Sequence, residues 1–321
     1  MSSRATLRLA SDPAGIAAAG RLLREGRLVA FPTETVYGLG ADATDGRAVA
    51  GIYEAKGRPS FNPLIAHVAT VEEALALGRF DADAGRLARA FWPGPLTLVV
   101  PMAEGAGISD LTRAGLDTVG LRVPGHPVAQ AILKAAGRPV AAPSANRSGH
   151  VSPTTAAHVL ADLDGRIDAV VDGGPTDVGV ESTIVACLGS TLVLLRPGGV
   201  LRAALEAILG RPLAAATGEA TIAPGMLASH YAPNAAIRLD ATTVAPGEAL
   251  LAFGSDVPAG AAAGQHARRD GRLAEAAASL FGFLRTLDAS GASRIAVMPI
   301  PAEGLGEAIR DRLARAAAPR D

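Results

Sequence analysis

Residues 27–40 read RLVAFPTETVYGLG, and this stretch decides the fold class. Its first part, residues 27–31, contains the short apolar run of a buried strand, which Pro32 ends. Residues 12–25, just before it, show the apolar spacing of a helix. A helix that leads directly into a buried strand indicates an α/β fold.

The same alternation continues along the chain. Further strands are expected at residues 64–68, 96–100, 119–123, 140–142, 169–172, 182–187 and 192–196, and helices at 71–77, 128–136 and 201–209. Several of these strands follow one another through short connections. We therefore expect a mixed sheet rather than a wholly parallel one.

The length of 321 residues predicts one large domain and one smaller domain. We assign residues 6–209 to the first and residues 235–321 to a small Rossmann-like α/β domain, with strands at 236–239, 249–253 and 294–299 and helices at 272–287 and 305–317. The Ala/Gly run at 259–264 is expected to form a loop. Residues 210–234 connect the domains, and their sequences APGM at 223–226 and SHYAP at 229–233 are too specific in chemistry for a flexible spacer.

The composition is that of a chain with a substantial core, because 49% of the residues are hydrophobic and only 19% are charged. A net charge of −1 provides no overall attraction to nucleic acid or to an anionic membrane. The first residues lack the pattern of a secretory signal, and no window reaches the roughly 18 uninterrupted apolar residues of a membrane span. We expect a cytoplasmic protein without a membrane partner.

Lysine and cysteine are both scarce. Lys56 and Lys134 are the only lysines among 30 basic residues, so each lysine stands out. The single cysteine, Cys187, excludes an internal disulfide and a multi-cysteine metal site. It lies in the apolar run 183–188, which favours a place in the core over a reactive role.

Polar side chains follow two of the expected strands. Thr33, Glu34, Thr35 and Tyr37 come after the first strand, at the edge where open α/β sheets bind ligands. They either orient a small polar substrate or belong to a turn that needs Pro and Gly for backbone reasons. His67 ends a later strand, where a histidine is either a ligand contact or a hydrogen-bonded core residue.

Four basic residues are candidates for binding anions. Lys56 and Arg58 lie in a segment that Gly57 makes non-helical, and they can converge on phosphate oxygens or form a solvated charge pair. Arg122 stands among apolar strand residues and needs a carboxylate or phosphate, from a ligand or from a structural Asp or Glu. Arg196 at a strand end binds phosphate or stabilises a turn.

The segment APSANRSG at 142–149 follows a buried strand and is dense in hydroxyl, amide and guanidinium donors. Such donors suit an anion or a purine edge, although a polar turn has the same composition. The sequence contains neither a GxxxxGK[ST] P-loop nor a nucleophile-elbow motif. Any ATP is therefore held without a Walker cradle, and covalent catalysis is not expected.

Together and in this order, these segments closely resemble the YrdC-like family of threonylcarbamoyl-adenylate synthases. The resemblance rests on PTETVYGLG at 32–40, KGRP at 56–59 followed by NPL at 62–64 and His67, PGPLT at 93–97, the strand around Arg122, SAN at 144–146 and EST at 181–183. It spans residues 6–196. Gly225, Met226, the HYAP sequence at 230–233 and the C-terminal domain resemble the two-domain form of this family.

The resemblance implies a twisted α/β domain whose mixed sheet encloses a basic cavity for ATP and L-threonine. It implies L-threonine contacts for Thr35, His67, Arg122, Ala142 and Ser182, with the carboxylate on Arg122. It implies ATP contacts for Arg58, Asn62, Thr118, Ser144, Ser152, Arg196, His230 and Tyr231, of which the last two form a lid. The implied catalytic residues, which hold the phosphates and the reacting carbamate, are Lys56, Arg58, Ser144 and Asn146.

The implied reaction joins L-threonine, bicarbonate or CO₂, and ATP to threonylcarbamoyl-AMP and pyrophosphate for modification of an adenosine in tRNA. Mg²⁺ is expected on the ATP phosphates, with no dedicated protein site. Expected partners are the proteins that transfer the product to tRNA, without stable direct RNA binding. One alternative is a non-catalytic RNA-binding module. The aromatic content of 3% argues against it, because such modules stack bases on aromatic side chains. The other is a carbamoyl-transfer enzyme of hydrogenase maturation, whose cysteine-rich zinc fingers a single cysteine excludes.

Overall fold

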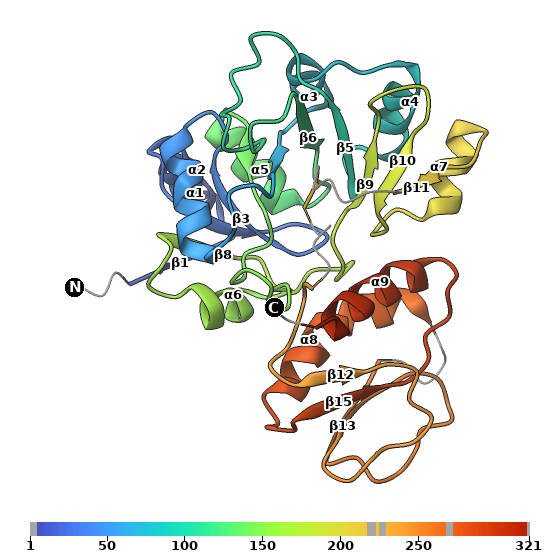
Figure 1. Ribbon diagram of the computed structural model, residues 1–321. Helices are drawn as coiled ribbons and strands as arrows, with labels where there is room; N and C mark the ends of the chain where they lie inside the picture. Colours follow the sequence, from blue (N-terminus) through green and yellow to red (C-terminus); the bar gives the residue numbers. More distant parts are fainter. Residues whose placement is uncertain (1–4, 217–222, 225–228, 268–271, 320–321) are drawn as a thin grey trace.

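The computed structural model describes residues 5–216, 223–224, 229–267 and 272–319. Within these ranges the chain forms a large N-terminal α/β domain and a smaller C-terminal one (Figure 1). No helix in this described part is long and apolar enough to cross a membrane.

The N-terminal sheet is mixed, as predicted from the short connections. Its described strands lie in the order β1-β8-β2-β3-β7-β4-β6-β5-β9-β10-β11. Their bounds are Leu7–Ala10 (β1), Val29–Pro32 (β2), Tyr37–Asp42 (β3), Ile65–His67 (β4), Leu96–Pro101 (β5), Thr118–Arg122 (β6), Val140–Ala141 (β7), Ala169–Asp172 (β8), Thr183–Ala186 (β9), Val193–Arg196 (β10) and Ala214–Ala215 (β11). β2 runs antiparallel to β3 but parallel to β8, and β5 runs antiparallel to β6 but parallel to β9.

Six of the seven described helices of this domain begin at a residue whose side chain accepts a hydrogen bond from the first turn, and the last begins at Leu201 without such a cap. The helices are Pro13–Arg24 (α1), Gly46–Lys56 (α2), Val71–Leu77 (α3), Ala82–Phe91 (α4), Pro127–Ala136 (α5), Ala156–Leu163 (α6) and Arg202–Leu209 (α7). The carboxylate of Asp12 accepts a hydrogen bond from the Gly15 amide at 2.8 Å and so caps α1. Gly20 lets α1 approach α5, because a Cβ atom there would lie 2.6 Å from the Cβ of Ala135.

Two local expectations were wrong. Lys56 does not lie in a loop but is the last residue of α2, because Gly57 adopts a left-handed conformation with φ of 61° and ends the helix only there. No strand was expected at residues 37–42, but they form β3, which is buried throughout. Gly40 lets the Phe31 ring of β2 pack closely against the β3 backbone, because a Cβ atom on Gly40 would lie 2.7 Å from that ring.

The C-terminal domain has a parallel sheet in the order β12-β15-β13-β14. Its elements are Ala236–Arg238 (β12), Ala249–Ala252 (β13), Ala263–His266 (β14), Leu273–Asp288 (α8), Arg294–Val297 (β15) and Leu305–Ala317 (α9). β14 begins within the Ala/Gly run that was expected to be a loop, because its backbone adds to the edge of the sheet next to β13. Both helices lie between this sheet and the N-terminal domain (Figure 1).

The connector between the domains is partly regular. Ala214 and Ala215 form β11, which pairs in parallel with β10 and extends the N-terminal sheet. Farther along, the amide of Ala232 donates to the carbonyl oxygen of Gly149 at 2.8 Å, which holds the HYAP sequence against the N-terminal domain. Gly225 and Met226 lie outside the described residues.

Candidate active site

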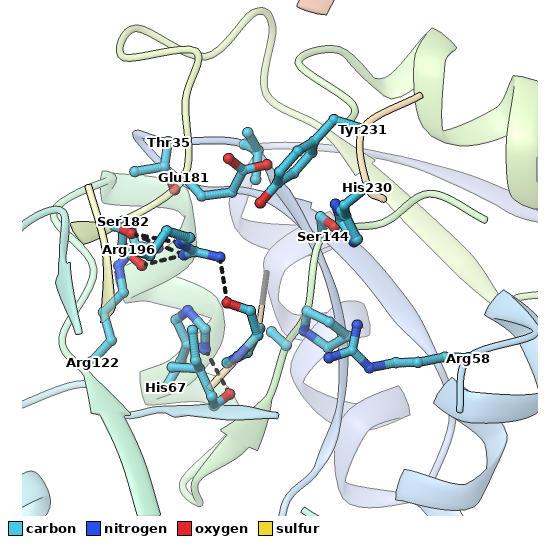
Figure 2. Close-up of a pocket in the computed structure, with 15 residues that line it drawn as sticks. Thr35, Arg58, His67, Arg122, Ser144, Glu181, Ser182, Arg196, His230 and Tyr231 are labelled. Carbon is cyan, nitrogen blue, oxygen red and sulfur yellow. Dashed lines mark hydrogen bonds between the residues drawn. The ribbon is translucent and has the colours of Figure 1, made fainter. Parts of the chain in front are cut away.

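A cavity of about 40 Å³ lies at the centre of the N-terminal domain, with the connector as one wall (Figure 2). Ten of the site residues expected from sequence line it, and they come from segments far apart in the chain. These are Thr35, Arg58, His67, Arg122, Ala142, Ser144, Ser182, Arg196, His230 and Tyr231. Val36, Ile65, Pro143, Glu181 and Pro224 complete the lining. Because a water needs roughly 10–15 Å³ of such space, the cavity has room for only a few waters.

Five other expected residues do not line the cavity. Lys56 and Ser152 lie directly behind the lining, because they donate hydrogen bonds to the lining residues Ser144 and Glu181. Asn146 is held beside them by a hydrogen bond from Lys56. Asn62 is fully buried, and its backbone oxygen accepts from Arg58 Nε at 3.3 Å. Thr118 begins β6, four residues before Arg122, and lies at the far end of that strand from the cavity.

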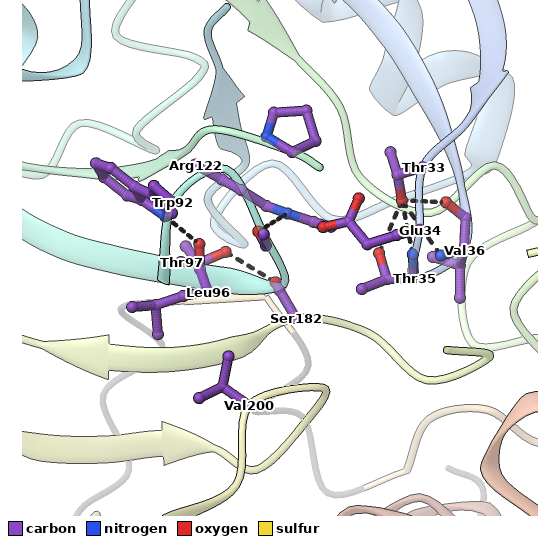
Figure 3. Close-up of polar contacts among 12 residues, drawn as sticks. Thr33, Glu34, Thr35, Val36, Trp92, Leu96, Thr97, Arg122, Ser182 and Val200 are labelled. Carbon is purple, nitrogen blue, oxygen red and sulfur yellow. Dashed lines mark hydrogen bonds and ion pairs between the residues drawn. The ribbon is translucent and has the colours of Figure 1, made fainter. Parts of the chain in front are cut away.

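Thr35, Ser182 and Arg122 line the cavity, and the hydroxyls of Thr33 and Thr97 contact the first two of them (Figure 3). Thr97 Oγ1 and Ser182 Oγ are 2.8 Å apart, and Thr35 Oγ1 lies 2.8 Å from Thr33 Oγ1. The same Thr33 hydroxyl accepts from the amides of Thr35 and Val36, so the turn between β2 and β3 is held in one conformation. These fixed hydroxyls suit a small polar ligand such as an amino acid.

The partner of Arg122 in this structure is Glu34. Arg122 Nη2 lies 2.7 Å from Glu34 Oε1, and Arg122 Nε donates to the Gly94 carbonyl oxygen at 3.3 Å. Burial acts to raise the pKa of Glu34, but the charge and hydrogen bond of Arg122 outweigh it and leave this pKa below its usual value. Arg122 is therefore charge-paired inside the protein, which is the structural alternative that the sequence had left open.

His67 is a neutral, buried neighbour of this arginine. Burial, together with the charge of Arg122, lowers the pKa of His67 to about 3. Its Nδ1 lies 3.2 Å from the Ile65 carbonyl oxygen. At neutral pH the ring can thus form hydrogen bonds without adding a positive charge.

A second cationic group consists of Lys56, Arg58 and Arg196, all of them buried. Lys56 Nζ donates to the carbonyl oxygens of Ser144 at 2.6 Å and Asn146 at 2.5 Å, which fixes the SAN sequence to the end of α2. Burial and the nearby charge of Arg58 lower the pKa of Lys56. Arg196 donates to the backbone oxygen of Ser182 from both Nε, at 3.1 Å, and Nη2, at 2.9 Å.

This second group lacks carboxylate partners at ion-pair distance among the described residues, although carbonyl oxygens accept its hydrogen bonds. Buried cations held by neutral acceptors are costly unless an anion joins them. The arrangement therefore favours a polyanionic ligand such as a nucleotide triphosphate.

His230 and Tyr231 close the cavity from the connector. Their rings are 4.0 Å apart in an edge-to-face arrangement, and Tyr231 stacks on Phe281 of α8 at 5.7 Å. Tyr231 has a φ of 63°, which is uncommon for a residue with a bulky side chain. Burial lowers the pKa of His230 to about 3 and raises that of the Tyr231 phenol.

Several buried polar atoms around the cavity have no hydrogen-bond partner. They include His230 Nδ1, Tyr231 OH, Asn146 Oδ1 and both side-chain amide atoms of Asn62. Nearly all buried polar atoms in proteins find a partner, so a cluster of unpartnered ones indicates where a ligand or ordered water belongs. Four of the expected contact residues are in this group.

Glu181 is a lining residue that sequence reasoning did not assign to the site. Its Oε1 accepts from Ser152 Oγ at 2.5 Å and its Oε2 accepts from Arg312 Nε of α9 at 2.7 Å. A charged residue directly before the apolar run 182–187 was the available signal. Arg312 lies 131 positions away, so no local pattern could have revealed this pair.

The fold and the cavity define a class of protein: a two-domain α/β protein with a cationic cavity, one wall of which comes from the connector, and without a P-loop. Residues 21–198 match the family model described as telomere recombination, and residues 200–318 match that of the threonylcarbamoyl-AMP synthase C-terminal domain. The chain belongs to the threonylcarbamoyl-AMP synthase family.

Individual relatives agree with this assignment over the whole chain. The threonylcarbamoyl-AMP synthase of Bacillus subtilis (strain 168) is 43% identical over 97% of this chain and 95% of its own. That of Pyrococcus abyssi (strain GE5 / Orsay) is 41% identical over 93% of this chain and 92% of its own. The crystal structure of P. abyssi Sua5 complexed with L-threonine has a TM-score of 0.89 and 38% identity, and it covers 97% of both chains.

Proposed function

We propose that this chain is an L-threonylcarbamoyladenylate synthase, a nucleotidyltransferase that forms threonylcarbamoyl-AMP and pyrophosphate from L-threonine, bicarbonate or CO₂, and ATP. The observation that carries the proposal is the cavity itself, where an arginine and fixed hydroxyls adjoin three buried cations. Full-length relatives with the synthase name, and the binding of L-threonine by P. abyssi Sua5, support this choice of substrates.

In the proposed reaction, the amine of L-threonine attacks CO₂ and loses a proton, which gives a carbamate. A carbamate oxygen then attacks the α-phosphorus of ATP, the bond to the β-phosphate oxygen breaks, and pyrophosphate leaves. Arg122 takes the threonine carboxylate, while Lys56, Arg58 and Arg196 offset charge on the phosphates. No covalent intermediate with the protein is needed, so catalysis rests on positioning and on fixed charge.

We infer the lid from where His230 and Tyr231 lie. Both line the cavity from residues 229–234, which form no helix or strand. These two side chains would move aside when ATP and L-threonine enter. Closed again over the substrates, they would keep water from a product that hydrolyses readily.

Mg²⁺ is part of the proposal as a companion of ATP. In the described part of the chain no group of three or more His, Cys, Asp or Glu residues could hold a metal ion. The two carboxylates nearest the cavity, Glu34 and Glu181, are each paired with an arginine. The residues thus fit a Mg²⁺ ion carried on the phosphate oxygens, where it would offset charge on the triphosphate.

The proposed product is consumed by proteins that transfer the threonylcarbamoyl group to tRNA, and we propose a cytoplasmic location. The test is pyrophosphate release from ATP by the purified protein with Mg²⁺ and bicarbonate, with L-threonine, with L-serine, or with neither. Release that needs both L-threonine and bicarbonate is expected. A folded, ATP-binding protein without such release would refute the synthase proposal and favour a non-catalytic binding module.

A further inference from the structure

One side chain of the C-terminal domain reaches the walls of the cavity. Arg312 lies in α9 and has 0% exposure, which is exceptional for an arginine. Its Nε donates to Glu181 Oε2 at 2.7 Å, and its Nη1 donates to the Pro197 carbonyl oxygen at 2.9 Å. Its guanidinium carbon also lies 5.2 Å from the centre of the Tyr231 ring, a cation–π contact.

These contacts fall on three separate segments. Glu181 accepts the hydrogen bond of Ser152, an expected ATP contact, and directly precedes Ser182, an expected L-threonine contact. Pro197 directly follows Arg196, and Tyr231 belongs to the lid. Glu181, Tyr231 and Arg196 all line the cavity (Figure 2). A single guanidinium therefore fixes the relative positions of the groups expected around the nucleotide.

The electrostatics make this arrangement hard to replace. Glu181 is buried, so its carboxylate needs the compensating charge of Arg312 and the hydrogen bond from Ser152. A planar guanidinium can bind a carboxylate, a carbonyl oxygen and an aromatic face at once, whereas a lysine ammonium cannot match this geometry. Nη1 also donates to Oδ2 of Asp311 at 2.7 Å, so two carboxylates contact this guanidinium, whereas Nη2 is buried without a partner.

We infer that Arg312 is a positioning residue through which the C-terminal domain organises the ATP-binding side of the cavity. It does not touch the substrates but acts through Glu181, the loop after β10, and Tyr231. Of the expected L-threonine contacts, Ser182 directly follows Glu181, whereas Arg122, His67 and Thr35 have no hydrogen bond or ion pair with Arg312. The inference rests on the proposed function for the identity of the nucleotide and gives the C-terminal domain a specific task in it.

The test compares Arg312→Met with Arg202→Met in the full chain. Arg202 of α7 pairs with Glu307, so it also joins the N-terminal domain to α9, but this pair is about one-third exposed and does not line the cavity. Equilibrium binding of ATP is measured directly, and the Michaelis constants for ATP and L-threonine are measured in the pyrophosphate assay. Direct ATP binding separates this inference from the proposed reaction, because it needs no turnover.

Arg312→Met is expected to weaken ATP binding by about tenfold or more, with the Michaelis constant for L-threonine changed by less than about threefold. Arg202→Met should leave both values close to wild type. A purely structural role would lower the folded fraction and kcat without raising the dissociation constant for ATP. Unchanged ATP affinity in folded Arg312→Met protein would overturn the inference.

Removal of one member of a buried pair can prevent folding, so a second pair of variants keeps the test decisive. In Arg312→Met/Glu181→Gln the buried Glu181 carboxylate is removed, and Asp311, which also pairs with Arg312, keeps its ion pair with Arg315. This variant should therefore fold yet still bind ATP weakly. Arg312→Lys keeps the charge but not the planar geometry, and it should also bind ATP more weakly than wild type. Wild-type ATP affinity in either variant would show that Arg312 does not position the nucleotide site.

Discussion

The carboxylate of Glu34 lies 2.7 Å from Nη2 of Arg122, in the cavity wall where the carboxylate of L-threonine is expected (Figure 3). Glu34 comes from the turn between β2 and β3, and its Oε2 is buried without a partner. The two carboxylates would carry the same charge beside the same guanidinium. In the proposed function, Glu34 competes with the substrate for Arg122.

Replacement of Glu34 by Gln is therefore expected to strengthen L-threonine binding. Both side chains of this pair are largely buried, so loss of the Glu34 carboxylate leaves the charge of Arg122 uncompensated until L-threonine binds. We expect a gain of about fivefold or more in affinity, which corresponds to about 1 kcal/mol. The measurement is a titration of L-threonine at saturating ATP. Glu104→Gln, an exposed change in the loop after β5, serves as the matched control. Weaker threonine binding in Glu34→Gln would mean instead that Glu34 holds Arg122 ready for the substrate.

The two lysines of the chain provide a matched pair of variants. Lys56 is buried and fixes the backbone oxygens of Ser144 and Asn146, whereas Lys134 is exposed near the end of α5. Lys56→Met should lower threonine-dependent pyrophosphate release by about 100-fold or more, as loss of a fixed donor to developing charge does. Lys134→Met should change it by less than about twofold.

Circular dichroism and thermal unfolding would show that both lysine variants remain folded. Undiminished turnover of folded Lys56→Met protein would refute the assigned role of Lys56. An equal loss in both variants would mean that a change in net charge, rather than the position of the amine, causes the effect.

Much of the fold could be predicted because apolar runs and helical spacing are local signals. Helices α3 and α9 were predicted with the observed bounds, and strand β8 likewise. The β3 strand was missed because both of its faces are buried, so it shows no polar alternation, and because glycine disfavours strands. The helix α2 was not predicted, because Gly51 in its interior and Gly57 and Pro59 after it are residues typical of loops.

The site could be predicted only as far as its motifs extend. Thr35, His67, Arg122 and Ser182 come from four segments that the sheet order brings together. The sequence identifies these segments but does not give the distances between their side chains. Whether Arg122 has a structural carboxylate as its partner could not be decided from sequence, because Glu34 is 88 positions away. Arg312 was missed for the same reason, since one arginine among 28 in a helical pattern has no distinguishing local signal.

The thiol of Cys187 should be unreactive in the folded protein. It is 4% exposed, and burial raises the pKa of its thiol to about 12, so the reactive thiolate is scarce at neutral pH. Cys187→Ala should retain wild-type turnover and lose about 1 kcal/mol of unfolding free energy from the smaller side chain. A thiol reagent should label the wild-type protein only after denaturation. Rapid labelling under native conditions, or loss of turnover in Cys187→Ala, would contradict a core role.

The stability of the protein should depend on pH through His158. This residue lies in α6, and its Nδ1 accepts a hydrogen bond from the Thr154 amide at 3.3 Å. Burial, with the nearby charge of Arg285, lowers the pKa of His158 to about 4, although Asp162 acts in the opposite direction. The ring is therefore neutral in the folded protein at pH values where it is protonated in the unfolded chain.

Between pH 6.5 and 4 the unfolded chain binds a proton at this position that the folded protein does not, so stability falls as the pH falls through this range. In His158→Asn, the amide oxygen can still accept from Thr154 but does not titrate. The free energy of unfolding should therefore decrease less steeply on acidification in this variant than in the wild type. Above pH 7 the difference in unfolding free energy between the two proteins should stay constant. Thermal unfolding across this pH range, with proton uptake measured by calorimetry, tests the prediction. Identical slopes would show that His158 is protonated as readily in the folded protein as in the unfolded chain.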